Sequence, residues 1–394
     1  MCKKSSSTDA LPSAASRRSS AANLTSSSSA RTASSTFSAT GPRNTAAAAN
    51  ISSSSTTAAA SSSSRSSGRS SLAAARASLP DPPVLYSFQE LAAATNSFLA
   101  KRASDSSDSA YPYWRCVLRA RHAALFQLRS SPGLTKAAAS AALARVARYH
   151  HTGLAPLLGA CLAGPHVYLA YELPDPSAAT LAACLQPRKN RNNAAGFTVL
   201  RTWLSRVQIA ADVAQGLDYV HTHAAQIHGR VSPSAVLVSD PGLRARLTHF
   251  GASQFAAAES DSSADAPSKE ADVYAFGVLL LGLLSGEAAA ARHRFDGATG
   301  EFVRVTVVET AAEAARSGRV RGWVDRRLGD SFPVAAAERL VEVGIRCAAA
   351  EAADRPDMSW AAGKVSKAYV ESIAWEHSLR PPTNSEFSVS LAPR

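Results

Sequence analysis

The chain has 394 residues and a net charge of +12, with 46% hydrophobic and 18% charged residues, which allows one large or two smaller folded domains with tails. Residues 1–80 contain 27 serines but only six Leu, Ile, Val or Phe residues, too few to bury a hydrophobic core. Nine basic residues and one acidic residue give this segment +8 of the net charge. We therefore predict a disordered, Ser- and Ala-rich basic tail over residues 1–80, followed by a folded part of about 300 residues.

The sequence argues against an integral membrane protein and against a secreted one. The most apolar stretch, residues 273–284, is shorter than the roughly 18 apolar residues of a membrane span, and it predicts a buried core helix. The start of the chain has no apolar signal-peptide segment. The cysteines form neither a disulfide framework nor a CxxC zinc pattern, which indicates a reducing compartment. They are Cys2, Cys116, Cys161, Cys184 and Cys347.

Neither nucleic acid nor a metal is an expected ligand. The basic tail has one aromatic residue, Phe37, so it offers no stacking platform for bases, and its basic residues are dispersed. The histidines at 150–151 and at 221 and 223 have no carboxylate or cysteine at ligand spacing beside them.

The first half of the folded part is predicted to be rich in strands. The stiff, Pro-rich boundary at residues 79–83 precedes a short helix from Phe88 to Phe98 and a polar stretch at residues 104–110. Hydrophobic runs and one Ala-rich helical stretch follow. The expected strands cover residues 114–118, 123–128, 154–161 and 166–172, and the expected helix covers residues 137–149.

The second half is predicted to be mainly helical. Apolar residues recur at spacings of four and three from Trp203 to Leu217, which is the pattern of an amphipathic helix. Strands at 236–238 and 243–248, joined by an Asp-Pro-Gly turn, precede a region that we expect to be helical to about residue 379. Strands first and helices later indicate an α+β protein with a small sheet-rich lobe and a larger helical lobe.

Several segments, in order along the chain, resemble the protein kinase domain of the plant receptor-like (Pelle-type) kinases. They are Ser87–Phe98, Tyr149–Leu154, Leu157–Cys161, Tyr168–Glu172, Asp272–Val278 and Asp354–Met358. The closing Gly363–Lys367 looks most like the LysM-type receptor kinases. The resemblance implies a bilobal protein-kinase-like domain over residues 81–375, with an N-lobe at 86–172, a C-lobe at 177–375 and a C-terminal tail at 376–394.

Phosphoryl transfer needs a Gly-rich loop, a Lys held by a Glu, metal-binding Asp and Asn residues, and a carboxylate that orients the attacking hydroxyl. The stretch between Phe98 and Trp114, where the Gly-rich loop should lie, contains no glycine. By motif register, Gln127 replaces the Lys and Ala142 replaces its Glu partner. We therefore expect the ion pair that holds the phosphates to be missing on both sides.

The catalytic loop and the metal-binding motif depart from the family pattern as well. Arg230 stands where the resemblance places the Asp base, Ser232 replaces a Lys, and Ala235 replaces the metal-binding Asn. His249 replaces the Asp of the "DFG" motif. An Arg cannot accept a proton, and Mg²⁺ prefers oxygen ligands. The activation segment is also short and lacks an "APE" anchor in its usual place.

Structural roles of the family are retained. The resemblance implies that His228 and Phe250 pack into the core between the lobes, and that Asp272 hydrogen-bonds the backbone of the catalytic loop. Arg355 resembles the residue that pairs with the missing Glu of "APE". Since an unpaired buried Arg is costly, we expect Glu270 or Asp265 to substitute, or Arg355 to be solvated.

No cofactor is expected, although ATP without Mg²⁺ stays open. The resemblance places an adenine-binding hinge at Tyr171, Glu172 and Leu173, and this strand is intact in the sequence. Nucleotide sensing without transfer is therefore one alternative function.

The tail carries candidate modification sites. Cys2, followed by Lys3 and Lys4, is a candidate for S-acylation, which together with the basic charge would favour the inner face of the plasma membrane. Arg-Ser-Ser sequences at 18–20, 65–67 and 69–71 are candidate phosphorylation sites. A Ser-rich, acid-poor tail is also typical of a chloroplast transit peptide, the alternative to a cytoplasmic location.

The sequence thus predicts a receptor-like cytoplasmic pseudokinase that acts as a signalling scaffold or allosteric partner of an active kinase or receptor. The alternative, from the enzyme class, is a weak or atypical Ser/Thr protein kinase that transfers phosphate from ATP. The expected partners are proteins, with peripheral membrane contact through the tail.

Overall fold

The structure is a computed structural model that describes residues 81–103, 111–186, 200–239, 242–257, 267–287, 291–296, 300–329 and 331–379. All of them belong to the compact unit Ser70–Arg394. The expectations for residues 1–80, including Cys2 and the phosphorylation sites, lie outside the described residues. So do those for residues 104–110, for Asp265 and for residues 380–394.

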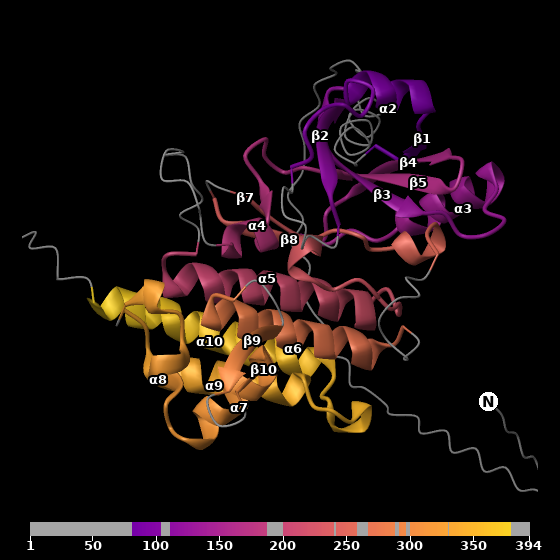
Figure 1. The fold of residues 1–394 in the computed structure, drawn as a ribbon. Helices are drawn as coiled ribbons and strands as arrows, with labels where there is room; N and C mark the ends of the chain where they lie inside the picture. Colours follow the sequence, from indigo (N-terminus) through magenta and orange to yellow (C-terminus); the bar gives the residue numbers. More distant parts are fainter. Residues whose placement is uncertain are drawn as a thin grey trace, which may run out of the picture. The chain divides into compact units, whose positions relative to one another are not determined.

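The N-lobe is built on a five-stranded sheet with the strand order β1-β4-β5-β3-β2 (Figure 1). Its antiparallel part consists of β2–β5, and β1 joins the edge in parallel with β4. Helices α2 (Phe88–Ala94) and α3 (Lys136–Val146) pack on this sheet. The strands are β1 (Val84–Leu85), β2 (Tyr113–Leu118), β3 (Arg121–Arg129), β4 (Leu157–Ala163) and β5 (His166–Glu172).

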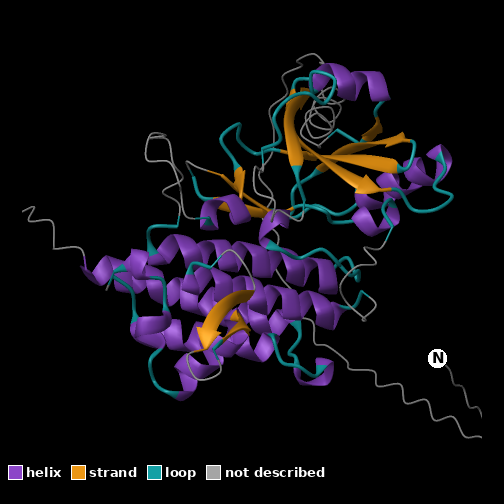
Figure 2. Cartoon of the chain, in the orientation of Figure 1, coloured by secondary structure: helices purple, strands orange, loops and turns teal. Residues whose placement is uncertain are grey.

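The C-lobe is helical, and three of its long helices, α5 (Trp203–Thr222), α6 (Lys269–Ser285) and α10 (Met358–Leu379), lie side by side (Figure 2). The antiparallel three-stranded sheet β6-β7-β8 lies beside α5. The remaining elements are α4 (Leu181–Leu185), β6 (Ala179–Thr180), β7 (Val236–Ser239), β8 (Arg244–Leu247), α7 (Val307–Arg316), α8 (Val320–Trp323) and α9 (Val334–Cys347). Short 3₁₀ turns occur at Pro233–Ala235, Ala252–Gln254, Arg326–Leu328 and Ala352–Asp354.

Six of the helices that the structure describes begin at a Ser or Thr whose side chain accepts a hydrogen bond from the backbone N–H three residues later. These N-caps satisfy one of the four N–H groups that a helix start leaves unpaired. In α2 and α7 the third residue is a Glu that returns the bond, which completes a capping box. The capping residues are Ser87, Thr135, Thr180, Thr202, Ser268 and Thr306.

One expectation for the C-lobe is wrong. The region between α6 and α7 is not helical throughout, because β9 (Ala291–Asp296) and β10 (Glu301–Thr306) form a two-stranded antiparallel sheet. The β-branched residues Val303, Val305 and Thr306 favour a strand, and Gly300, at φ +71°, takes a backbone conformation that other residues rarely adopt. At the other end, α10 ends at Leu379, where the helical region was expected to end.

The two faces of the N-lobe sheet belong to different cores. Leu91 of α2 packs with Trp114 and Leu125 on one face. Residues on the other face, such as Ala124 and Phe126, join a core that continues into α5 and α6. Since side chains alternate along a strand, each residue of β3 faces either the outer core or the interface between the lobes.

Candidate functional site

His249 lies at the centre of the region between the lobes. It follows β8, is completely buried, and has a left-handed backbone with φ +66°. Its Nδ1 is 2.7 Å from the hydroxyl of Thr248, while its Nε2 has no hydrogen-bond partner in the described part of the chain. A left-handed conformation in a non-glycine residue is costly and is typical of functional sites.

Three aromatic side chains surround the His249 ring. Ring-centroid distances from His249 are 4.5 Å to Tyr111, 4.5 Å to Phe126 and 5.7 Å to Tyr171. These are the distances at which aromatic pairs stabilise a packed core. We call these four residues the aromatic cluster; they come from β3, β5 and the segments before β2 and after β8.

The aromatic cluster keeps His249 neutral. Burial, together with the nearby His228 and Arg230, lowers the pKa of His249 well below its ordinary value. The hydroxyl of Tyr171 donates to the carbonyl of Phe250 at 3.3 Å, and burial raises the pKa of Tyr171. The described residues contain no group of three or more His, Cys, Asp or Glu side chains that could hold a metal ion.

Phe126, rather than Gln127, is the β3 residue that faces His249. Gln127 is the next residue along the strand, so its side chain points to the opposite face. The structure therefore favours Phe126 for the position that the motif register gave to Gln127, a shift of one residue. Ala142 is buried in α3 within the same core, so neither position carries a charge.

Arg230 contributes a cation to this region. Its guanidinium lies 5.7 Å from the centroid of the Tyr111 ring and donates to the carbonyl of Ala257 at 3.1 Å. The hydroxyl of Ser232 is buried and has no hydrogen-bond partner among the described residues. Ala235 is fully buried, and its carbonyl accepts hydrogen bonds from the N–H and the hydroxyl of Thr248.

The described start of the activation segment is held against the N-lobe. The N–H of Ala257 donates to the carbonyl of Arg129, and the N–H of Ser131 donates to the carbonyl of Phe255, at 3.0 and 2.9 Å. Gln254 accepts a hydrogen bond from Arg145 of α3 at 3.0 Å. These bonds fasten the residues after His249 to both β3 and α3.

Asp272 and His228 hold the backbone of the catalytic loop through hydrogen bonds. The carboxylate of Asp272 accepts from the backbone N–H groups of His228 and Gly229, both at 2.7 Å, and lies 3.0 Å from Nε2 of His221. These are the backbone contacts that the resemblance implied for Asp272. Nδ1 of His228 accepts from the N–H of Arg230, so its Nε2 carries the proton and donates to the carbonyl of Thr248 at 2.9 Å. Burial lowers the pKa of His228, which keeps this ring neutral.

Phe250 and Arg355 occupy different surroundings. Phe250 is buried and meets Tyr149 edge-on, with centroids 5.9 Å apart.

Arg355 is half-buried and donates to backbone carbonyls, including that of Glu270 at 3.1 Å, and it stacks on Tyr274. The expected role of the Glu270 carboxylate is therefore taken by the carbonyl oxygen of the same residue. These contacts and partial solvation satisfy the guanidinium.

The hinge-like strand has few free groups for a nucleotide. The N–H of Glu172 donates to Pro156 at 2.9 Å, and the N–H of Leu173 donates to His122 at 3.0 Å. Pro174 has no N–H, and the side chain of Tyr171 is committed to the aromatic cluster. The donors that would read an adenine edge at residues 172–174 are thus already used or missing.

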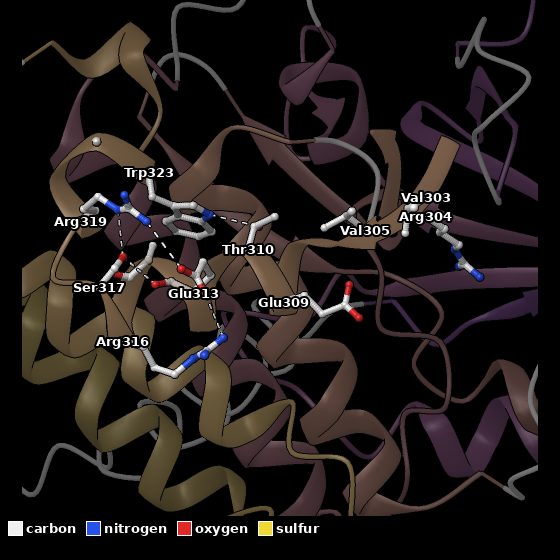
Figure 3. A pocket seen from close by; sticks show the side chains of 12 residues that line it. Val303, Arg304, Val305, Glu309, Thr310, Glu313, Arg316, Ser317, Arg319 and Trp323 are labelled. Carbon is white, nitrogen blue, oxygen red and sulfur yellow. Dashed lines mark hydrogen bonds and ion pairs between the residues drawn. The ribbon is translucent and has the colours of Figure 1, made fainter. Parts of the chain in front are cut away.

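A concave surface lies in the C-lobe between β10, α7 and α8, with a volume of about 810 Å³ (Figure 3). Arg316 and Arg319 both pair with Glu313, at 3.0 and 3.5 Å, and the indole of Trp323 donates to Thr310. Glu309 is engaged in the capping box of α7. Both carboxylates of this surface are thus occupied by structural contacts, and we assign no chemistry to it.

Sequence reasoning did not find the aromatic cluster. Tyr111 follows the loop without glycines, and motif register alone gives no reason for it to reach His249. The strand period offered a signal for Phe126, because Ala124 and Phe126 share one face of β3.

None of the helices that the structure describes is long and apolar enough to cross a membrane.

The fold is that of a protein kinase. The pseudokinase domain of BIR2, an immune regulator of the RLK/Pelle family, superimposes with a TM-score of 0.57 over 79% of this chain and 98% of that one, at 22% identity. No protein-family model matches the chain.

The homologues of the chain are plant receptor-like kinases, LysM-type receptor kinases among them. Chitin elicitor receptor kinase 1 of Arabidopsis thaliana is 29% identical over 315 residues, which cover 75% of this chain and 48% of the relative. LysM domain receptor-like kinase 3 of the same plant is 24% identical over 76% of the chain and 48% of its own length. A leucine-rich repeat receptor-like protein kinase from Arabidopsis is 29% identical over 63% of the chain. The chain spans only 29% to 48% of the length of these relatives.

Proposed function

We propose that the protein is a catalytically inactive receptor-like kinase, a pseudokinase that works as a binding module in signalling. The observation that carries this proposal is the aromatic cluster. Tyr111, Phe126, Tyr171 and His249 pack against one another where the kinase fold binds its nucleotide. A nucleotide would have to displace buried side chains, and no described acidic group there would hold Mg²⁺.

The charges of the region also oppose phosphoryl transfer. A substrate hydroxyl needs a carboxylate that orients it, and Arg230 supplies a cation at that position of the catalytic loop. The face of β3 that should neutralise the phosphates carries Phe126. Loss of such charge stabilisation costs a factor of about 10² or more in rate for a single group.

The retained scaffold supports a role in protein binding. Asp272 and His228 keep the catalytic-loop backbone in place without any catalytic group to position. A kinase fold that keeps its architecture and fills its active site can serve as a docking partner for an active kinase or receptor. We propose a cytoplasmic role, with the basic tail and Cys2 supporting contact with the inner face of the plasma membrane.

Transfer is tested on the purified full chain with γ-labelled ATP and Mg²⁺. The kinase domain of chitin elicitor receptor kinase 1 serves as a positive control for the assay. We expect no label in the full chain and none in an added generic substrate protein. Incorporation of label that is lost in an Arg230→Ala variant would support a weak or atypical kinase instead.

The docking role is tested by capture from plant extract with the full chain as bait. We expect a catalytically intact receptor-like kinase to be enriched, with a yield that does not change when Mg²⁺ and ATP are added. Enrichment of no kinase over a control bait, or capture that requires ATP, would contradict the proposed role.

A further inference from the structure

A cavity of about 740 Å³ lies apart from the aromatic cluster, behind the hinge-like strand. It is lined by the loop at residues 149–158, by Arg246 of β8, by Arg121 and Glu172 of the N-lobe sheet, and by residues 81–83. Its volume falls within the range of about 300–1,000 Å³ that is usual for small-molecule sites. Its lining includes Glu172 of the hinge-like strand and Phe250, but the expectations above assign no ligand to this cavity.

Backbone hydrogen bonds fix the walls of the cavity. The N–H of Ala155 donates to the carbonyl of Leu247, and the N–H of Leu247 donates to the carbonyl of Gly153, both at 2.8 Å. The same loop is tied to β5 where the N–H of Glu172 donates to Pro156 at 2.9 Å. The cavity is therefore pre-formed by regular structure, which lowers the entropic cost of binding.

Most of the lining is apolar and partly accessible. Pro83, Tyr149, Pro156 and Leu157 are half-buried, so their side chains can cover the apolar body of a ligand. Leu154 lies deeper and is buried. An apolar molecule would gain free energy by transferring surface from water to this lining.

The charged groups of the lining leave one cation without a partner. Arg121 and Glu172 pair with each other at 2.8 Å. His151 stacks on Tyr219, accepts a hydrogen bond from Gly153, and has its pKa lowered by burial. Asp81 lies exposed at the rim.

Arg246 is the unpartnered cation. Its Nε is buried without a hydrogen-bond partner, and no described residue forms an ion pair with its guanidinium. A buried donor without a partner is costly, and a guanidinium matches the two oxygens of a carboxylate. An anionic group beside Arg246 would remove this cost.

We propose that the cavity behind the hinge binds a small amphipathic carboxylate, with its apolar body against Tyr149, Pro156 and Leu157 and its carboxylate on Arg246. This ligand site is separate from the aromatic cluster, so it does not depend on the proposed pseudokinase role. A ligand bound in this cavity would let the protein respond to a small molecule at the back of the interlobe region.

The test uses 4-phenylbutanoate and its neutral analogue 4-phenylbutanamide as probes, with binding to the full chain measured by ligand-observed NMR. We expect saturable binding of the carboxylate, and binding about tenfold weaker for the amide, because a charge-assisted hydrogen bond is lost. Equal binding of both probes, or no saturable binding of the carboxylate, would overturn the proposal. This comparison needs no variant.

Variants locate the site. Arg246→Gln is expected to weaken carboxylate binding about tenfold and to leave amide binding unchanged, while Arg246→Lys retains part of the preference. Arg244→Gln is the matched control, since Arg244 is an exposed arginine of the same strand outside the cavity. If Arg246→Gln, shown to be folded by its thermal denaturation, binds the carboxylate as well as the wild type does, the assignment to this cavity is wrong.

Discussion

His249 combines a strained backbone with a fully buried, neutral ring. The left-handed conformation costs about 1–3 kcal/mol, which the surrounding structure has to offset. Contacts with Tyr111, Phe126 and Tyr171 supply that stabilisation, because each ring pair adds about 0.5–1.5 kcal/mol beyond the area it buries. At this position the chain therefore favours packing over ligand chemistry.

The buried imidazole predicts a pH dependence of stability. Unfolded His249 binds a proton below about pH 6.5, whereas burial lowers the pKa of the folded residue well below that value. The unfolded state thus binds more protons, and the free energy of unfolding falls as the pH drops below about 6.5, by up to about 1.4 kcal/mol per pH unit for this residue.

His249→Phe should reduce that slope when urea unfolding is followed between pH 5 and pH 7. Some slope should remain, because burial also lowers the pKa values of His228 and His151. The same slope in the variant and the wild type would mean that His249 is protonated in the folded protein, contrary to this account.

Gly251 offers a second prediction at the scale of one residue. Its φ of +78° disfavours other residues, and a Cβ there would overlap Cγ2 of Val146 in α3. Gly133 has a similar φ of +72° but open space around it, so Gly133→Ala measures the backbone cost alone. We expect Gly251→Ala to lower the free energy of unfolding by about 1–3 kcal/mol more than Gly133→Ala does, measured by urea denaturation. Equal losses would show that α3 is not packed against Gly251.

Among the secondary-structure elements, local sequence patterns predicted β5 and α5 better than the two short strands between α6 and α7. The strand His166–Glu172 was expected with the bounds that β5 has, and the apolar period from Trp203 marked the start of α5. The strands β9 and β10 were missed because short strands with several charged residues have no clear hydrophobic alternation. Motif register chose Gln127 instead of Phe126 because it compares residue types along the sequence. It does not take into account that side chains alternate between the two faces of a strand.

A buried ion pair connects α5 to the segment before α9. Arg206 and Asp325 meet at 2.6 Å, and their side chains are 0% and 8% exposed. Replacing one partner leaves the other charge buried, so Asp325→Asn should lower the free energy of unfolding by about 3–5 kcal/mol. The exposed pair Arg339–Glu371 is the control, and Glu371→Gln should cost about 1 kcal/mol or less. Thermal and urea denaturation check both values, and a small effect of Asp325→Asn would mean that the α5 contact is solvated.

For the whole molecule, the sequence predicted which chemical groups are missing but not what takes their place. Arg230, Ala235 and His249 could be assigned from motif register, because the catalytic loop and the "DFG" position lie in recognisable segments. The packing of Tyr111 on His249 joins residues far apart in the chain, so no local pattern contains it. The structure adds that the side chains of Tyr111, Phe126 and Tyr171 pack around His249 between the lobes, which supports the proposed lack of activity.

Titration of the full chain with ATP and Mg²⁺ in an isothermal calorimeter tests the central claim most directly. If the aromatic cluster fills the nucleotide site, no saturable heat should appear, either with Mg²⁺ or with ATP alone. Saturable binding of one ATP per chain that weakens in a Tyr171→Ala variant would contradict the account, because it would place the nucleotide among the residues of the cluster.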